Sequence, residues 1–154
     1  MRLLDYMDRK LIFLDVAARS KEEAIAEVVR RMKENGAIKD EAELLGELNN
    51  RETQGGTSLG NGVAIPHARL DSLDRIVVAM ARLTAAVNFN EGDREPVRLI
   101  FILVTPADKA AEYLKVLAKL AKALRGEDLL KKLFEAKSEV VAWEMFEAVE
   151  NSEP

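Results

Sequence analysis

Short apolar runs alternate along the chain with longer stretches in which apolar residues recur every three or four positions. The first pattern is typical of strands and the second of amphipathic helices. Strands are predicted over residues 11–15, 63–65, 76–83 and 97–104. Helices are predicted over residues 20–36, 40–52, 105–126, 129–134 and 138–149. The run at 97–104 is nearly all apolar, which predicts a central strand covered on both faces.

Polar residues mark where two of the helices begin. Ser20 and Glu23 have the spacing of a capping box, in which the serine hydroxyl and the glutamate carboxylate satisfy free helical N–H groups. Asp40 and Glu43 repeat that spacing before the second helix. Both starts agree with the apolar periodicity that follows them.

Glycine and proline punctuate the other boundaries. Gly36 and Gly126 are expected to end the first and third helices. Pro106 is expected in the first turn of the third helix, where its missing N–H costs nothing. Residues 88–95 contain Asn90-Glu91-Gly92-Asp93 and are predicted to form a turn.

Strands that alternate with helices predict an α/β fold in which helices cover a mixed sheet. The 154 residues are sufficient for one domain with its own core, spanning residues 1–154. No internal repeat or long linker divides the chain.

Composition excludes several classes of function. The net charge of −4 provides no general basic field for nucleic acid, and without cysteine there is no disulfide or thiolate site. A single histidine argues against zinc, so we expect neither a metal nor a cofactor. No apolar stretch approaches the ~20 residues that span a bilayer. Acidic residues near the N-terminus are unlike a signal peptide. These features predict a cytoplasmic protein without direct membrane insertion.

His67 is the only histidine, and four of the eight glycines lie just before it, at positions 55, 56, 60 and 62. Taken alone, a histidine is more often a surface or core residue, and glycines mark any loop. However, a glycine-rich backbone can bring N–H groups close to an anion, and imidazole can accept a group near neutral pH. Pro66 also restricts Ile65 to an extended backbone, so the approach to His67 is stiff. The combination suggests chemistry on a phosphate.

Other phosphate and nucleophile motifs do not fit. A P-loop needs lysine where Asn61 stands, and the dinucleotide fingerprint needs a third glycine where Ile65 stands. No serine lies in a G-x-S-x-G elbow. Nucleotide binding and serine catalysis are therefore disfavoured.

The segment around His67 resembles a known family. Arg51-Glu52, Gly55 to Gly60, and the string from Gly62 to Arg69 resemble the fructose/mannitol-type IIA domain, EIIA type 2, of the bacterial phosphoenolpyruvate-dependent phosphotransferase system. Further similarity lies at Ser20-Lys21, Pro96-Val97 and Thr105-Pro106. The resemblance implies a mannitol-type IIA fold with a mixed, mostly five-stranded sheet flanked by helices.

The resemblance also implies a phosphotransferase activity. His67 would accept a phosphoryl group on Nε2 from an HPr-like phosphocarrier protein, and would pass it to a IIB component or signal its state to a regulated protein. Phosphoryl transfer needs positioning and charge stabilisation, which Arg51 can supply as a planar cation. Arg51 could alternatively serve only the C-terminal end of its helix. Arg69 could simply be solvated, and Glu52 is expected to orient Arg51 or a loop amide.

The loop before His67 is expected to contact the phosphate. Backbone N–H groups and the hydroxyls of Thr57 and Ser58 would supply the hydrogen-bond donors. The predicted phosphate-loop residues are Gly56, Thr57, Ser58, Gly60 and Gly62.

One position departs from the family pattern. The family commonly has a second histidine just before a leucine of the Leu-rich helix, and Tyr113 occupies that position here. Tyrosine can donate a hydrogen bond but cannot become a cation at neutral pH. We expect the Tyr113 hydroxyl to approach His67, although the helical pattern also fits a core or rim aromatic.

Three functions are compatible with these residues. The stand-alone chain and its opening segment at residues 1–7 favour the nitrogen-regulatory IIA branch of the family. A sugar-specific IIA for a fructose- or mannitol-type transporter shares the same motif. A non-catalytic binding module is the third, suggested by Tyr113 and opposed by the intact Arg51 and His67.

Overall fold

One mixed sheet forms the centre of the protein. The computed structural model describes residues 2–90 and 95–152, and five strands pair within them. The order across the sheet is β1 (Met7–Val16), β4 (Val77–Val87), β5 (Val97–Thr105) and β2 (Val63–Ala64), with β3 (His67–Arg69) also paired to β5. Strands β4 and β5 are antiparallel, whereas the β1–β4, β2–β5 and β3–β5 pairs are parallel. The predicted α/β class with a mixed five-stranded sheet is confirmed.

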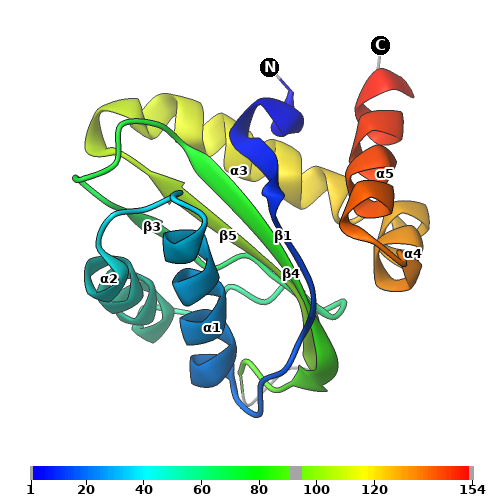
Figure 1. Ribbon diagram of the computed structural model, residues 1–154, viewed down its shortest axis with the longest axis horizontal. Coiled ribbons are helices and arrows are strands. Elements are labelled where there is room, and N and C mark those ends of the chain that lie inside the picture. The colour runs from blue at the N-terminus through cyan, green and yellow to red at the C-terminus, as the bar shows by residue number, and fades with distance from the viewer. Residues whose placement is uncertain (1, 91–94, 153–154) are drawn as a thin grey trace.

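Helices cover both faces of this sheet (Figure 1). On one face lie α1 (Lys21–Glu34) and α2 (Glu41–Thr53). On the other lie α3 (Ala110–Ala123), α4 (Glu127–Glu135) and α5 (Glu139–Ser152). Two short 3₁₀ helices, η1 (Leu3–Tyr6) and η2 (Ala107–Lys109), precede β1 and α3. No helix within the described residues is both long and apolar enough to cross a bilayer.

Strand β5 is buried on both faces, as its apolar sequence predicts. Alternate side chains enter different cores because successive residues of a strand point to opposite faces. Over residues 99–104, Ile100, Ile102 and Val104 pack with α1 and α2, and Leu99, Phe101 and Leu103 pack with α3, α4 and α5. Val97, which precedes this alternating run, also lies in the core beside α1 and α2. All seven are fully buried, and each contributes roughly 1.5–3 kcal/mol relative to exposure.

The predicted caps open α1 and α2. Ser20 Oγ accepts a hydrogen bond from the Glu23 N–H at 3.1 Å, and the Asp40 carboxylate accepts one from the Glu43 N–H at 3.0 Å. The reciprocal bond expected from the Glu23 side chain is replaced by an ion pair, with Arg19 Nε at 3.7 Å.

Several boundaries differ from the predicted ones. Gly126 does not end the third helix: α3 ends at Ala123, and Gly126 is the N-cap of α4. Pro106 precedes the 3₁₀ turn η2 rather than lying within a continuous helix. Both β1 and β4 exceed their predicted lengths, because the added ends are mostly exposed residues, at 8–10 in β1 and 84–86 in β4, and carry no apolar run. Of the predicted turn at 88–95, residues 91–94 lie outside the described part of the chain.

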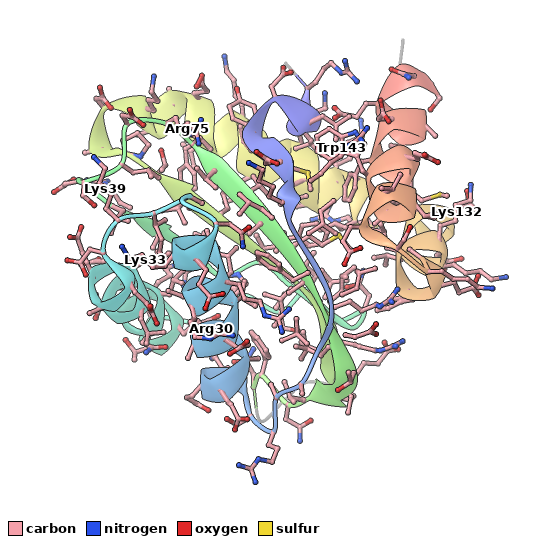
Figure 2. All side chains as sticks on the ribbon, in the orientation of Figure 1. Arg30, Lys33, Lys39, Arg75, Lys132 and Trp143 are labelled. Atoms are coloured by element: carbon pink, nitrogen blue, oxygen red, sulfur yellow. The ribbon has the colours of Figure 1, made fainter. Side chains whose placement is uncertain are left out.

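The N-terminal turn η1 lies beside the C-terminal helix α5 (Figure 1). The Glu150 carboxylate of α5 accepts hydrogen bonds from the N–H groups of Leu3 and Leu4 at 2.8 and 2.9 Å. Trp143 of α5 lies against the N-terminal segment, with the Arg9 guanidinium 5.4 Å from its ring centroid (Figure 2). A carboxylate on free N–H groups and a cation over an aromatic face both favour this arrangement.

A buried arginine holds the C-terminal end of α4 against the sheet. Nη1 of Arg82, on β4, donates to the carbonyl oxygens of Leu133, Phe134 and Ala136 at 3.0, 3.2 and 2.6 Å. The last carbonyls of a helix have no partner within the helix, so a cation placed there satisfies both their hydrogen bonding and the helix dipole. Asp15 Oδ1 lies 3.7 Å from Nη2.

We predict that Arg82→Met lowers the free energy of unfolding by about 2–4 kcal/mol, because it leaves buried carbonyl groups without a charged donor. Denaturant titration followed by circular dichroism measures the change. Arg125→Met, at an exposed position, is the matched control and should stay within about 0.5 kcal/mol of the parent. Equal unfolding midpoints for the Arg82 variant and the parent would show that this contact is dispensable.

Candidate active site

His67 is the first residue of β3, a strand that the sequence pattern did not predict. Register with β5 places His67 opposite Leu103, and the Leu103 N–H donates to the Pro66 carbonyl at 3.0 Å. Pro66 cannot donate to a sheet, so it separates β3 from β2. The histidine backbone is thus fixed by the central strand directly after a break in the pairing.

The imidazole has a defined orientation. His67 Nδ1 lies 2.7 Å from the carbonyl oxygen of Ile65, two residues earlier. A carbonyl can only accept, so this contact places the ring proton on Nδ1 when the imidazole is neutral. Nε2 then carries the free lone pair, as a nucleophile requires.

A pocket of about 550 Å³ opens beside the half-buried ring. Its lining comes from α2, β3, the end of β5 and α3: Glu47, Asn50, Arg51, Gln54, His67, Ala68, Arg69, Thr105, Ala110, Tyr113, Leu114 and Leu117. The structure thus brings together His67, Arg51 and Tyr113, which the sequence analysis singled out. The ring centroids of Tyr113 and His67 are 6.1 Å apart.

The pocket is suited to an anion although the chain as a whole is acidic. Arg51 and Arg69 contribute two positive charges to its lining and Glu47 contributes one negative charge, for a net of +1. Arg69, which the sequence analysis allowed to be simply a solvated residue, lines the same pocket as Arg51. No group of three or more metal-ligating side chains is assembled anywhere in the described residues.

Arg51 makes a contact at the end of its helix and also lines the pocket. It lies in the last turn of α2, and its Nη1 donates to the Gly55 carbonyl at 2.8 Å, just beyond the helix end. The same side chain lines the pocket. The helix-end contact therefore fixes a cation that faces His67.

The glycine-rich segment forms a hairpin and not a cradle at the pocket. Residues 57–59 run antiparallel to residues 63–65, with Leu59 N–H donating to Val63 O and Ile65 N–H to Thr57 O. Gly60 and Gly62 have φ values of 83° and 84° and form the turn, which explains why glycine is needed there.

The five predicted phosphate-loop residues are consequently absent from the lining of the pocket. The Thr57 hydroxyl donates to the Glu52 carboxylate, and Ser58 Oγ accepts from the Gly60 N–H at 3.3 Å. Gly56 packs so closely on Asn90 that a Cβ there would lie 2.0 Å from its amide nitrogen. Glu52 also differs from expectation, since it binds a hydroxyl rather than Arg51 or an amide.

The surroundings set the protonation state of both rings. Burial lowers the pKa of His67 below its ordinary value; the Ile65 hydrogen bond raises it, Arg51 lowers it and Glu52 raises it. Burial raises the pKa of Tyr113, opposed by the positive charges of Arg51 and Arg69. The imidazole is therefore neutral and the phenol protonated near pH 7.

Three polar residues of α2 are the part of the site that sequence reasoning missed. Glu47, Asn50 and Gln54 line the pocket together with the predicted Arg51. Their spacing of three, four and seven residues is that of one helix face. A polar stripe at this spacing, leading to Arg51, was the signal that could have identified them.

Comparison with known proteins agrees with this geometry. Residues 5–149 match the family model described as phosphoenolpyruvate-dependent sugar phosphotransferase system, EIIA 2. A nitrogen regulatory protein of Bradyrhizobium diazoefficiens is 35% identical over 133 residues, which cover 86% of each chain. A fructose-specific EIIA component of Haloferax volcanii is 33% identical over 129 residues, covering 84% of each.

A solved structure has the same fold. The nitrogen regulatory protein IIA-Ntr from Neisseria meningitidis superimposes with a TM-score of 0.85 at 30% identity, covering 92% of this chain and 97% of that one. Sequence, fold and the pocket at His67 thus lead to one conclusion: the chain belongs to the EIIA type 2 family of the phosphoenolpyruvate-dependent sugar phosphotransferase system.

Proposed function

We propose that His67 is a phosphoryl acceptor and donor. Nε2 attacks the phosphorus of a phosphohistidine on an HPr-like phosphocarrier protein. The donor N–P bond breaks as the Nε2–P bond forms, and the electron pair of the broken bond stays with the donor imidazole. The observation that carries this proposal is the 2.7 Å contact between His67 Nδ1 and Ile65 O, which leaves Nε2 free.

The pocket supplies the charge stabilisation that phosphoryl transfer needs. A bound phosphoryl group carries roughly two negative charges, which two guanidinium groups lining the pocket can offset. Transfer requires little covalent chemistry from the protein beyond such positioning. Arg51 and Arg69 therefore act as phosphate-stabilising residues, and the Tyr113 hydroxyl acts as a neutral donor.

The partners follow from the family. The phosphorylated protein passes its group to a IIB component, or a target protein responds to the change in charge. The related sequences include both nitrogen regulatory and fructose-specific proteins, so both outcomes belong to the proposal. A purely non-catalytic binding module is less well supported, because it would not need an oriented imidazole in a pocket that two arginines also line.

The decisive experiment is phosphorylation in a reconstituted system. We expect the protein to gain an acid-labile, base-stable phosphate when incubated with phosphoenolpyruvate, enzyme I and a phosphocarrier. His67→Gln, which lacks a nucleophilic ring nitrogen, should gain none. A label on that variant would place the acceptor elsewhere, and no label on the folded parent would refute the phosphocarrier function.

We predict that Arg51→Met slows phosphorylation by roughly a hundredfold, the effect of removing one preorganised charge-stabilising donor. It should also raise the pKa of His67, since the positive charge of Arg51 disfavours the imidazolium. NMR titration of the only histidine measures the pKa directly.

The same reasoning sets the direction of the pH dependence. Because the neutral ring is the nucleophile, the rate should fall as pH decreases through the pKa of His67. In Arg51→Met, whose His67 pKa is expected to be raised, this loss of rate should begin at a higher pH than in the parent. Arg125→Met, an exposed control, should reproduce the parent in both measurements. A pKa in Arg51→Met equal to or below that of the parent would contradict the assigned electrostatics.

We predict that Tyr113→Phe slows transfer about 2- to 10-fold, the range for losing one neutral hydrogen bond, without lowering the melting temperature. Tyr6→Phe is the matched control, because Tyr6 is also a partly buried tyrosine packed against the core on the α3 side and lies outside the pocket lining. If both variants transfer at the parental rate, the Tyr113 hydroxyl has no part in the reaction.

A further inference from the structure

A buried charged cluster lies behind the hairpin that leads to His67. The Glu52 side chain is only 4% exposed and that of Lys21 15%. Glu52 Oε2 lies 3.4 Å from Lys21 Nζ, an ion-pair contact without hydrogen-bond geometry. Glu52 Oε1 accepts the hydroxyl proton of the buried Thr57. Three segments therefore meet at one carboxylate: the start of α1, the end of α2 and the first strand of the hairpin.

Burying this carboxylate carries a free-energy cost, which suggests that the cluster has a role other than stability. Removal of an ion from water costs several kcal/mol, and a nearby opposite charge often only balances that cost. An apolar residue would fill the same space without the penalty. The cluster instead gives the hairpin one defined position, because the hydrogen bond from the Thr57 hydroxyl to the Glu52 carboxylate holds Thr57 at one place relative to α2.

Two backbone contacts connect Thr57 to the imidazole of His67. The Thr57 carbonyl accepts the Ile65 N–H at 3.0 Å, and the Ile65 carbonyl lies 2.7 Å from His67 Nδ1. The Ile65 N–H and carbonyl belong to adjacent peptide groups joined at its Cα, and the proline that follows restricts Ile65 to an extended backbone. A shift at Thr57 therefore moves the Ile65 carbonyl. Strand β2 has only two residues and cannot hold that carbonyl alone.

The far end of the hairpin is held independently. Asn61 Nδ2 donates to the Leu124 carbonyl after α3 at 3.1 Å, and the Gly62 carbonyl accepts from Arg98 and Leu99 N–H at 2.9 and 3.1 Å. The turn therefore stays in place when the Glu52–Thr57 contact is removed. Loss of that contact should loosen the base of the hairpin, which is the end nearest His67.

We propose that Glu52 and Thr57 are positioning residues for His67, which fix the Ile65 carbonyl and through it the Nδ1–H tautomer and ring orientation. This inference rests on the proposed phosphoryl transfer. Glu52 does not line the pocket, so its carboxylate acts through Thr57 and not as a base on the reacting group. Lys21 Nζ is the cation beside this carboxylate.

The test compares Thr57→Val, which removes the hydroxyl at similar size, with Thr57→Ser, which retains it. Thr53→Val is the matched control, since the exposed Thr53 hydroxyl donates to Asn50 O on the same helix. The protein carries ¹⁵N-labelled histidine, and the two ring nitrogen shifts of His67 report the tautomer. Phosphorylation rates are measured on the same samples.

We expect Thr57→Val to lose the single Nδ1–H state in favour of a mixture with the Nε2–H tautomer. Its transfer rate should fall by tenfold or more, as an imprecisely placed nucleophile can cost up to about a hundredfold. Thr57→Ser should restore the parental tautomer and rate, and Thr53→Val should change neither. Glu52→Gln keeps an acceptor for the hydroxyl but loses the charge, so an intermediate result is expected.

A folded Thr57→Val protein with the parental tautomer and rate would overturn the proposal. If that variant does not fold, Glu52→Gln replaces it, and parental values there are equally contradictory. The tautomer is measured without any phosphoryl donor. Failure of the parent to accept phosphate would therefore reject the proposed function while the positioning role is still tested by NMR.

Discussion

The buried strand β5 is the constraint on which the remaining architecture depends. Its backbone groups have no access to water, so both of its edges must be paired. One edge is filled by the long strand β4, and the other by two short pieces, β2 and β3. Ala64 pairs with Ile100 and His67 with Leu103, so the register is the same on both sides of the break at Pro66. His67 is located where an otherwise continuous strand is interrupted.

The interruption has a chemical consequence. Between Ala64 and His67 the Ile65 N–H turns to the hairpin, and the Ile65 carbonyl turns to the imidazole. A continuous strand would direct these groups into the sheet ladder and would leave the histidine tautomer unassigned. Pro66 therefore has two effects: it interrupts the pairing with β5, and it restricts the backbone of the segment that leads to His67.

Patterns local to the sequence predicted the large helices and strands and identified His67 as the candidate site residue. The apolar run of β5 and the helix-start signals at Ser20 and Asp40 depend on neighbouring residues, so they could be interpreted without the fold. The hairpin at the glycine segment was not predicted, because positive φ serves a hairpin turn as well as an anion cradle and the pairing partners are not local. Strand β3 was missed because three residues carry no period, and the partner that makes them a strand lies 36 residues later. The contacts of Glu52 and Arg82 are likewise between distant segments.

The end of α2 separates two opposite charges that are adjacent in sequence. Successive helical residues point about 100° apart, which follows from ~3.6 residues per turn. Arg51 consequently faces the pocket, while Glu52 faces the buried cluster with Lys21. Their effects on the pKa of His67 oppose each other, and burial then decides that the ring stays neutral. In the proposed transfer, an incoming phosphoryl group meets the guanidinium in the pocket, because the carboxylate lies outside the pocket lining and has a cationic partner. Under that proposal, one helix turn supplies both attraction to the phosphoryl group and support for the nucleophile. The charge that provides the support does not repel the phosphoryl group at close range.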